Sequence, residues 1–377
     1  MNYKFPEIRT IEDVLPYIEG RDEFIVAERE GYTVVNYVVS MQDTFNMSGP
    51  DDIGGAIRRE CRGLIFDADG NIMSRPFHKF FNVNEREETQ DYVLELEMRS
   101  DHVVMEKMDG SMIRPILLDG ELRLATKMGV TTVAIQAEEW LDTQSADMKT
   151  WLRKCVEDCV TPLLEWVSPF NQIVLAYEEA NLVYLGTRDN TTGAYLMDKS
   201  CPFDAVPQYG AVEGNIVDYV ALARQAQSRE GDIIRFANGH MVKVKNDWYV
   251  RIHKTLDRIV FDRNIVNLII NEEVDDVIPM LPKAQASRVR DFEISFWSEF
   301  AATEERLMLL FLEAQMLFGD RKRIALELVP TLKHRGDAQF IFRMLDGNSC
   351  RDLLLEHIRK HVSTNSRWNT CAEWMKN

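Results

Sequence analysis

Strand-forming patterns end abruptly near residue 252, and this change constrains the fold more than any other feature of the chain. Before that point, short runs of β-branched and aromatic residues are separated by turn signals such as Asp-Gly and Asn-Gly. After it, apolar residues recur every three or four positions, which is typical of amphipathic helices. We therefore expect an α+β protein with an antiparallel-sheet domain over residues 1–251 and an all-α domain over residues 252–377.

The first domain is predicted to hold many short strands with one helical block inserted between them. A helical pattern covers about residues 131–160, and strand patterns cover residues 32–39, 63–66, 103–107, 112–118, 122–126, 163–167, 173–177, 182–187, 232–236 and 241–245. Asp-Gly turn signals join the three strands between 103 and 126. These three strands are therefore predicted to form one meander.

The charge distribution argues against a protein that coats nucleic acid without specificity. The chain has 44 Lys and Arg against 61 Asp and Glu, and nearly all of the net charge of −17 lies in residues 1–251. Such a surface repels a bare polyanion at long range. A local basic cleft is still allowed, because salt limits the reach of exposed charges to about 10 Å.

Cysteine usage and the apolar segments indicate a reducing cytoplasm. The six cysteines include no C-x-x-C pair, so neither a zinc site nor a disulfide framework is predicted. The first seven residues have no apolar core, and the strongest apolar stretch, residues 307–318, is interrupted by Glu313 and Gln315. The sequence therefore predicts neither secretion nor a membrane span.

A lysine nucleophile is the first candidate for chemistry. The segment Lys107-Met108-Asp109-Gly110-Ser111 lies between two predicted strands and combines an amine, a carboxylate and a glycine that lets a substrate approach the backbone. A lysine that attacks phosphorus must be neutral, so its ordinary pKa near 10.4 must be lowered by cations, metal or burial. Because three fixed residues are a weak motif, other positive groups should converge on Lys107.

Paired lysines supply such charges late in the first domain. In residues 242–245, Lys243 and Lys245 lie on one face of a predicted strand and the two valines on the other, because side chains alternate along a strand. This pattern predicts a cationic face over a buried face. The alternative is an ordinary half-buried edge strand with solvated lysines.

Two glutamates and two further cations complete the set of candidates. Glu165 interrupts an otherwise apolar strand, and Glu230 directly precedes another. They could hold a ribose hydroxyl or the Mg²⁺ that accompanies a triphosphate, with a solvated or ion-paired glutamate as the alternative for each. Arg62 and Lys79 add positive charge, although either one alone would be assigned to the surface.

These motifs follow one another along residues 32–250 in a characteristic order. The order is Glu60-Cys61-Arg62-Gly63, Arg75-Pro76-x-x-Lys79-Phe80-Phe81-Asn82, Lys107-x-Asp109-Gly110-Ser111, Glu165, Glu230-Gly231 and Lys243-Val244-Lys245-x-Asp247-Trp248-Tyr249. It resembles the covalent nucleotidyltransferases, most closely the ATP-dependent tRNA-repair RNA ligases of T-even-type bacteriophages. The chain departs from its nearest relatives at Met108, where they carry an acidic residue.

The resemblance implies a nucleotidyltransferase fold for the first domain and an ATP-dependent RNA ligase as the enzyme. Lys107 would attack the α-phosphate of ATP, release pyrophosphate and carry AMP, with Mg²⁺ as the metal and Mn²⁺ as its substitute. The AMP would then move to the 5′-phosphate of an RNA end. A 3′-hydroxyl would displace it and close the phosphodiester bond.

The resemblance also assigns roles to individual residues. Asp109 would help to position the attacking group, Glu165 would contact the ribose or the metal, and Glu230 would support the metal. Lys243 and Lys245 would neutralise phosphate charge. The remaining assignments are Arg62, Lys79 and Lys127 to phosphates or the RNA end, Leu185 and Ile233 to the two faces of adenine, and Tyr249 to RNA or phosphate.

The helical domain carries no motif for chemistry, and for this domain the resemblance implies tRNA recognition. The expected partners are single-stranded RNA ends, in particular tRNA broken in the anticodon loop. The expected protein is a monomer that a phage makes in the bacterial cytoplasm. A DNA ligase or an mRNA-capping nucleotidyltransferase is the alternative enzyme, disfavoured because no OB-type strand pattern follows the first domain. A non-catalytic RNA- or protein-binding module would form no covalent adenylate.

Overall fold

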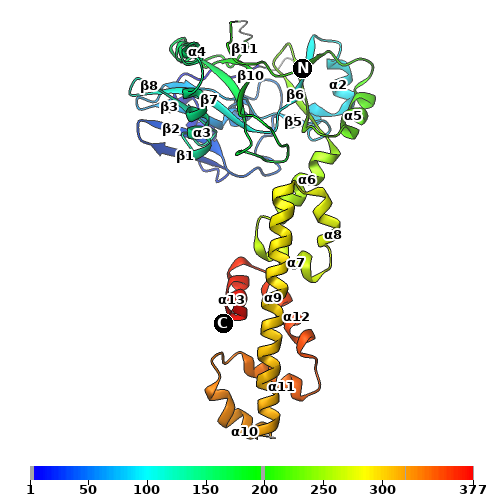
Figure 1. The fold of residues 1–377 in the computed structure, drawn as a ribbon. Coiled ribbons are helices and arrows are strands. Elements are labelled where there is room, and N and C mark those ends of the chain that lie inside the picture. The colour runs from blue at the N-terminus through cyan, green and yellow to red at the C-terminus, as the bar shows by residue number, and fades with distance from the viewer. Residues whose placement is uncertain (1–3, 197–199, 319, 377) are drawn as a thin grey trace. The chain divides into compact units, whose positions relative to one another are not determined.

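The computed structural model describes residues 4–196, 200–318 and 320–376 (Figure 1). The chain divides into two compact units, Met1–Val250 and Arg251–Asn377. Every strand among the described residues lies in the first unit, whereas the described elements of the second unit are helical. The fold is therefore α+β, with antiparallel sheets followed by a helical C-terminal region, as the sequence predicts.

The strands of the first unit form three sheets, which we number in chain order. Sheet 1 consists of β1 (Phe24–Arg29), β2 (Tyr32–Tyr37), β3 (Arg62–Asp67) and β4 (Ile72–Ser74). Sheet 2 has the order β11 (Tyr195–Leu196), β10 (Asn181–Asp189), β9 (Val160–Val167), β7 (Ser111–Leu118) and β8 (Glu121–Ala125). Sheet 3 has the order β12 (Gln208–Gly210), β6 (His102–Lys107), β13 (Gly231–Phe236), β14 (Met241–Lys245) and β5 (Phe81–Asn82), and β5 runs parallel to β14.

Helices cover one face of sheet 2 and one face of sheet 3. Apolar side chains of α3 (Thr132–Asp142) and α4 (Ala146–Glu157) form one buried cluster with residues of β7, β9 and β10. Those of α2 (Asp91–Glu97) and α5 (Ile216–Gln225) form another with residues of β6, β13 and β14. α1 (Ile53–Glu60) begins after Asp52, whose carboxylate accepts the amide hydrogen of Gly55 and so caps the helix. The opposite faces of sheets 2 and 3 remain available to line a site.

The predicted meander over residues 103–126 is wrong, because β6 and β7 belong to different sheets. β6 pairs with β12 and β13, whereas β7 pairs with β8 and β9. The chain passes from sheet 3 to sheet 2 at Asp109-Gly110. A Cβ atom on Gly110 would lie 2.3 Å from the carbonyl oxygen of Trp166, so glycine is required for this passage beside β9.

Other predicted elements also need correction. Residues 173–177 form no strand; they lie in a loop between β9 and β10. The predicted helical block consists of two helices, of which the first ends at Asp142 and the second at Glu157. Pro162 lies inside β9, where it is paired with Thr187. The remaining predicted strands correspond to strands of the structure, with ends that differ by at most three residues.

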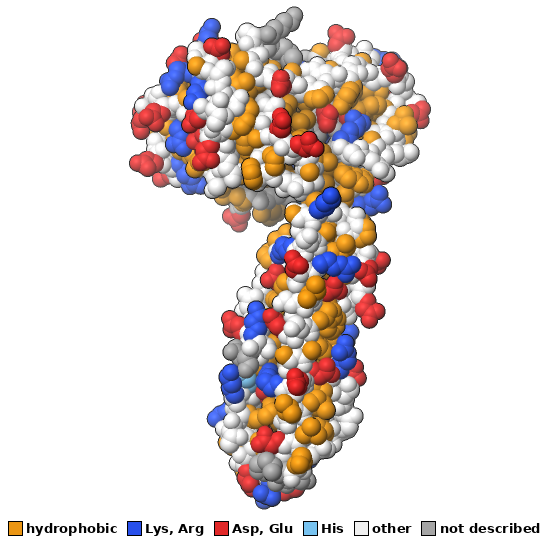
Figure 2. All heavy atoms as spheres, viewed as in Figure 1, with side chains coloured by type: hydrophobic (Ala, Val, Ile, Leu, Met, Phe, Trp, Pro, Cys, Tyr) orange, Lys and Arg blue, Asp and Glu red, His pale blue; other side chains and the backbone are white. Residues whose placement is uncertain are grey.

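The second unit is built around α9 (Lys283–Glu313), whose buried residues Val289, Phe296, Phe300 and Leu307 form one apolar stripe. The other α-helices in the described part of this unit are α6 (Asp247–Arg258, which begins in the first unit), α7 (Asp262–Ile270), α8 (Val274–Val277), α10 (Arg321–Arg323), α11 (Asp337–Leu345), α12 (Cys350–His361) and α13 (Asn365–Lys376). Figure 2 shows basic and acidic side chains intermixed over the visible face of this unit. Among the described residues, no helix has the length and apolar character needed to cross a bilayer.

Candidate active site

A cavity of about 630 Å³ in the first unit brings together most of the residues that the sequence singles out. Its walls come from β6, β13 and β14 of sheet 3 and from β7, β9 and β10 of sheet 2. The predicted site residues that line it are Arg62, Lys107, Lys127, Glu165, Leu185, Ile233, Lys243 and Lys245. Five positive side chains therefore converge on one cavity, although the surrounding unit is strongly acidic.

Strand register places Lys107 and Lys245 on either side of Glu230. Gly231 of β13 pairs with Lys107 of β6 on one side and with Lys245 of β14 on the other. The preceding residue, Glu230, is almost fully buried, and its Oε1 atom lies 2.7 Å from Lys107 Nζ and 3.2 Å from Lys245 Nζ. A Cβ atom on Gly231 would meet the carbonyl oxygen of Val244 at 2.0 Å, so glycine is needed for this close pairing. One carboxylate thus holds both amines at the cavity.

The predicted alternation along β14 is confirmed. Val242 and Val244 are buried against the helices, whereas Lys243 and Lys245 line the cavity. β14 lies between β13 and β5, so it is not an edge strand. Burial, and after it the nearby charges of Arg62 and Lys79, together lower the pKa of Lys243 to about 7.

Glu165 faces the cavity from the middle of sheet 2, where β9 is paired on both sides. Burial raises the pKa of Glu165 to about 7; the charge of Lys107 opposes this shift and the charge of Glu230 adds to it. The negative charge of Glu230 thus acts on Glu165. The carboxylates of Glu165 and Glu230 offer the oxygen donors that Mg²⁺ prefers.

Asp109 and Tyr249 do not line the cavity. The Oδ2 atom of Asp109 accepts hydrogen bonds from the amides of Val174 (2.8 Å) and Leu175 (2.6 Å), and Oδ1 accepts one from the Tyr249 hydroxyl (2.7 Å). Asp109 thus holds the loop that follows Lys107 in place, in keeping with a positioning role. Tyr249 is only 2% exposed, so the predicted contact between Tyr249 and RNA or phosphate is corrected to a buried hydrogen bond with Asp109.

Lys79 is not among the residues that line the cavity, and its contact with phosphates or the RNA end stays a prediction. Its Nζ atom is 3.3 Å from the hydroxyl of Tyr37, 4.9 Å from the centre of that ring and 5.2 Å from the centre of the Phe45 ring. Burial acts to raise the pKa of Tyr37, but the charges of Lys79, Arg62 and Lys127 outweigh burial and lower it. Lys79 therefore acts on the site through its charge.

A glycine and a buried arginine bring Arg62 and Lys127 to the same wall. Gly63 has φ +99°, and a Cβ atom there would lie 2.6 Å from the carbonyl oxygen of Lys127, so only glycine allows β3 to approach this segment. Arg114 of β7 is fully buried and donates to the carbonyl oxygen of Gly63. Burial, with the charge of Arg62, lowers the pKa of Arg114 to about 9. The sequence carries no signal that Arg114 points inward.

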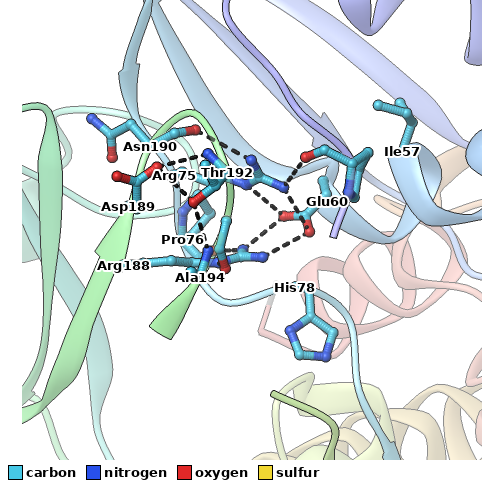
Figure 3. A network of polar contacts seen from close by, with 12 residues as sticks. Ile57, Glu60, Arg75, Pro76, His78, Arg188, Asp189, Asn190, Thr192 and Ala194 are labelled. Atoms are coloured by element: carbon cyan, nitrogen blue, oxygen red, sulfur yellow. Dashed lines mark hydrogen bonds and ion pairs between the residues drawn. The ribbon is translucent and has the colours of Figure 1, made fainter. Parts of the chain in front are cut away.

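A buried ionic cluster next to this wall was also not predicted (Figure 3). Glu60, the last residue of α1, accepts two hydrogen bonds of 2.7 Å from the guanidinium of Arg188 in β10 and one of 3.2 Å from Arg75 Nε. All three side chains are at most 1% exposed. Burial acts to raise the pKa of Glu60, but Arg188 and Arg75 lower it to about 2. The cluster ties α1, and through it Arg62, to sheet 2.

Comparison with known proteins agrees with this geometry. Residues 60–249 match a family model described as RNA ligase, over half of the chain and including every residue that lines the cavity. The chain belongs to the RNA ligase family.

Individual relatives of this RNA ligase support the same assignment. A "Putative RNA ligase" of Thermovibrio ammonificans is 28% identical over 319 residues, which cover 80% of each chain. RNA ligase 1 of bacteriophage TS2126 is 29% identical over 195 residues, 50% of this chain and 47% of the relative. The chain thus spans four fifths of the first relative and about half of the second.

Among solved structures, a Naegleria gruberi RNA ligase with pyrophosphate aligns at 15% identity over 47% of this chain and 58% of that chain, with a TM-score of 0.38. The alignment thus covers less than half of the chain described here. A TM-score of this size adds no weight to the family assignment, which stands on the sequence match.

Proposed function

We propose that this RNA ligase is ATP-dependent and works through AMP bound covalently to Lys107. The convergence of Lys107, Lys243 and Lys245 on one cavity carries the proposal. Amines at these positions can meet the phosphates of a nucleotide, while Leu185 and Ile233 offer apolar surface to its base. The volume of the cavity is in the range that small-molecule sites occupy.

The first step balances as a nucleotidyl transfer. Lys107 Nζ, after it loses a proton, attacks the α-phosphorus of ATP; a P–N bond forms and the P–O bond to pyrophosphate breaks. Glu230 Oε1 lies within hydrogen-bond distance to accept the proton. Lys243 and Lys245 neutralise charge that develops on the phosphate oxygens. Glu165 and Glu230 would hold Mg²⁺, or Mn²⁺ in its place, which supplies further neutralisation of the triphosphate.

The later steps define the RNA substrate. AMP moves from Lys107 to the 5′-phosphate of an RNA end, and a 3′-hydroxyl displaces AMP to form the phosphodiester bond. We propose that the substrate is a tRNA broken in the anticodon loop and that residues 252–377 recognise it. We also propose a monomer that acts in the cytoplasm of a phage-infected bacterium. Competition between a tRNA cut in its anticodon loop and a single-stranded RNA of equal length tests the tRNA part.

Intact-mass measurement after incubation with ATP and Mg²⁺ tests the proposed function. The protein is expected to gain the mass of one AMP, and peptide mapping should place the gain on Lys107, because the α-phosphate becomes bonded to its amine. GTP should give no such gain. A gain from GTP alone would point to a capping enzyme, whereas preferential sealing of nicked duplex DNA over single-stranded RNA would point to a DNA ligase.

Binding of ATP without metal is expected to take up about one proton at a pH near 8. The pKa of Lys243 is about 7, so its amine is mostly neutral at that pH. The negative charge of a bound triphosphate raises this pKa, so the amine takes up a proton when ATP binds. Calorimetric titration in buffers of different ionisation enthalpy, with a chelator present, measures the uptake. Arginine stays protonated, so Lys243→Arg should lose most of this uptake. Equal uptake in Lys243→Arg and the unchanged protein would show that Lys243 does not meet the phosphates.

A further inference from the structure

Three metal-ligating side chains meet within the described part of the second unit. His357 and His361 lie one turn apart on α12, and Cys371 lies on the neighbouring α13. One ligand atom from each residue lies within 4.8 Å of the other two. The two imidazole rings are stacked with their centres 4.1 Å apart.

The hydrogen bond of His361 suits a metal ligand. Its Nδ1 atom lies 2.8 Å from the carbonyl oxygen of His357, one turn earlier in α12. An Nδ1–H group that donates to this carbonyl leaves the lone pair on Nε2. Histidines that bind metals commonly have this arrangement, because the backbone oxygen fixes both the tautomer and the orientation of the ring.

Aromatic side chains pack against this cluster. The rings of Phe340 and Trp374 lie 5.3 and 4.9 Å from that of His357, and Trp374 Nε1 donates to Asp337. The cluster therefore presents two imidazole groups and one thiol beside aromatic side chains.

We propose that His357, His361 and Cys371 bind one Zn²⁺ ion, which joins α12 to α13. Nitrogen and sulfur donors select zinc over Mg²⁺ or Ca²⁺, which prefer oxygen. Zn–N bonds of about 2.0 Å and a Zn–S bond of about 2.3 Å require the ligand atoms to approach one another by roughly 1 Å. The Cys371 thiol loses its proton to solvent as the Zn–S bond forms, and water occupies the fourth position.

The sequence predicted no zinc site, because the cysteines include no C-x-x-C pair. The proposed ligands are His-x-x-x-His followed by one cysteine ten residues later, a spacing without a C-x-x-C pair. Only the packing of α13 against α12 brings Cys371 to the histidines. The proposal is independent of the ligase reaction, because all three ligands belong to the second unit.

Cobalt titration of the full-length, chelator-treated protein tests the site. One equivalent of Co²⁺ is expected to produce the visible bands of tetrahedral cobalt and a thiolate-to-cobalt charge-transfer band, and Zn²⁺ should remove both. Cys371→Ser should lose the charge-transfer band, and His361→Gln should weaken binding at least about 100-fold. Cys350→Ser, a buried cysteine of the same unit outside the cluster, should keep both bands.

A second measurement on the unchanged protein guards against variants that fail to fold. Zinc should protect Cys371 from alkylation, as mapped by mass spectrometry, and should raise the melting temperature of the helical unit. The proposal is overturned if one equivalent of Co²⁺ gives no charge-transfer band in the unchanged protein, or if Cys371→Ser keeps that band. AMP attachment to Lys107 should be the same with and without Zn²⁺, so neither result bears on the proposed ligase reaction.

Discussion

Replacing Lys107 with alanine or arginine is expected to abolish the AMP adduct and to lower RNA joining from ATP by at least about 1,000-fold. Alanine removes the nucleophile. Arginine keeps the positive charge beside Glu230, but a guanidinium does not give up its proton and cannot attack phosphorus. Intact mass and gel assays of RNA joining measure both effects.

Two controls separate loss of the nucleophile from loss of the fold. Lys149→Arg, an exchange at an exposed ion pair with Asp142, should leave both measurements unchanged. RNA that already carries AMP on its 5′-phosphate needs no lysine nucleophile, so Lys107→Arg should still join it at a measurable rate. An AMP adduct of normal yield in either Lys107 variant would show that another residue is the nucleophile.

Replacing Glu60 with glutamine is expected to lower the free energy of unfolding of the first unit by about 3–5 kcal/mol, because two buried guanidinium groups lose their counter-ion. Arg75 and Arg188 are fully buried, so water cannot take the place of the carboxylate. Urea unfolding followed by hydrogen exchange in peptides from β3 and β10 reports on this unit alone.

The matched control for this variant is Asp142→Asn, which removes an exposed ion pair with Lys149 in the same unit. Its expected effect is below about 0.5 kcal/mol. A Glu60→Gln protein as stable as Asp142→Asn would contradict the role of the cluster. Because the folded-state pKa of Glu60 is lowered from 4.5 to about 2, its contribution to stability is present above pH 4.5 and is lost as the pH falls toward 2.

The sequence predicted the parts of the site that depend on local pattern. Alternation along β14 put Lys243 and Lys245 on one face, and the turn signal after Lys107 put this lysine at the end of a strand. The prediction of a meander is wrong because an Asp-Gly signal indicates a turn but does not indicate which sheet the next strand joins. Residues 173–177 have strand-forming side chains, yet they form a loop. Two of their backbone amides donate hydrogen bonds to the carboxylate of Asp109 and not to a neighbouring strand.

The parts that were not predicted depend on partners far apart in the chain. Glu60 and Arg188 are separated by 128 residues, and no local pattern links them. The sequence also does not reveal which groups surround Lys79, whose amine lies beside the aromatic rings of Tyr37 and Phe45. Burial of Tyr249 follows from its bond to Asp109, which only the folded chain reveals.

The length of the turn between β13 and β14 determines which side chains of β14 face the cavity, and therefore the charge of the cavity wall. Ile233 faces Lys243 and Gly231 faces Lys245, and the turn over residues 237–240 sets this register. A shift of β14 by one residue against β13 would turn Val242 and Val244 toward the cavity. It would also place the amines of Lys243 and Lys245 in the apolar core beneath α5. One inserted or deleted residue in that turn, which itself touches no phosphate, would thereby reverse the polarity of the wall that receives the triphosphate.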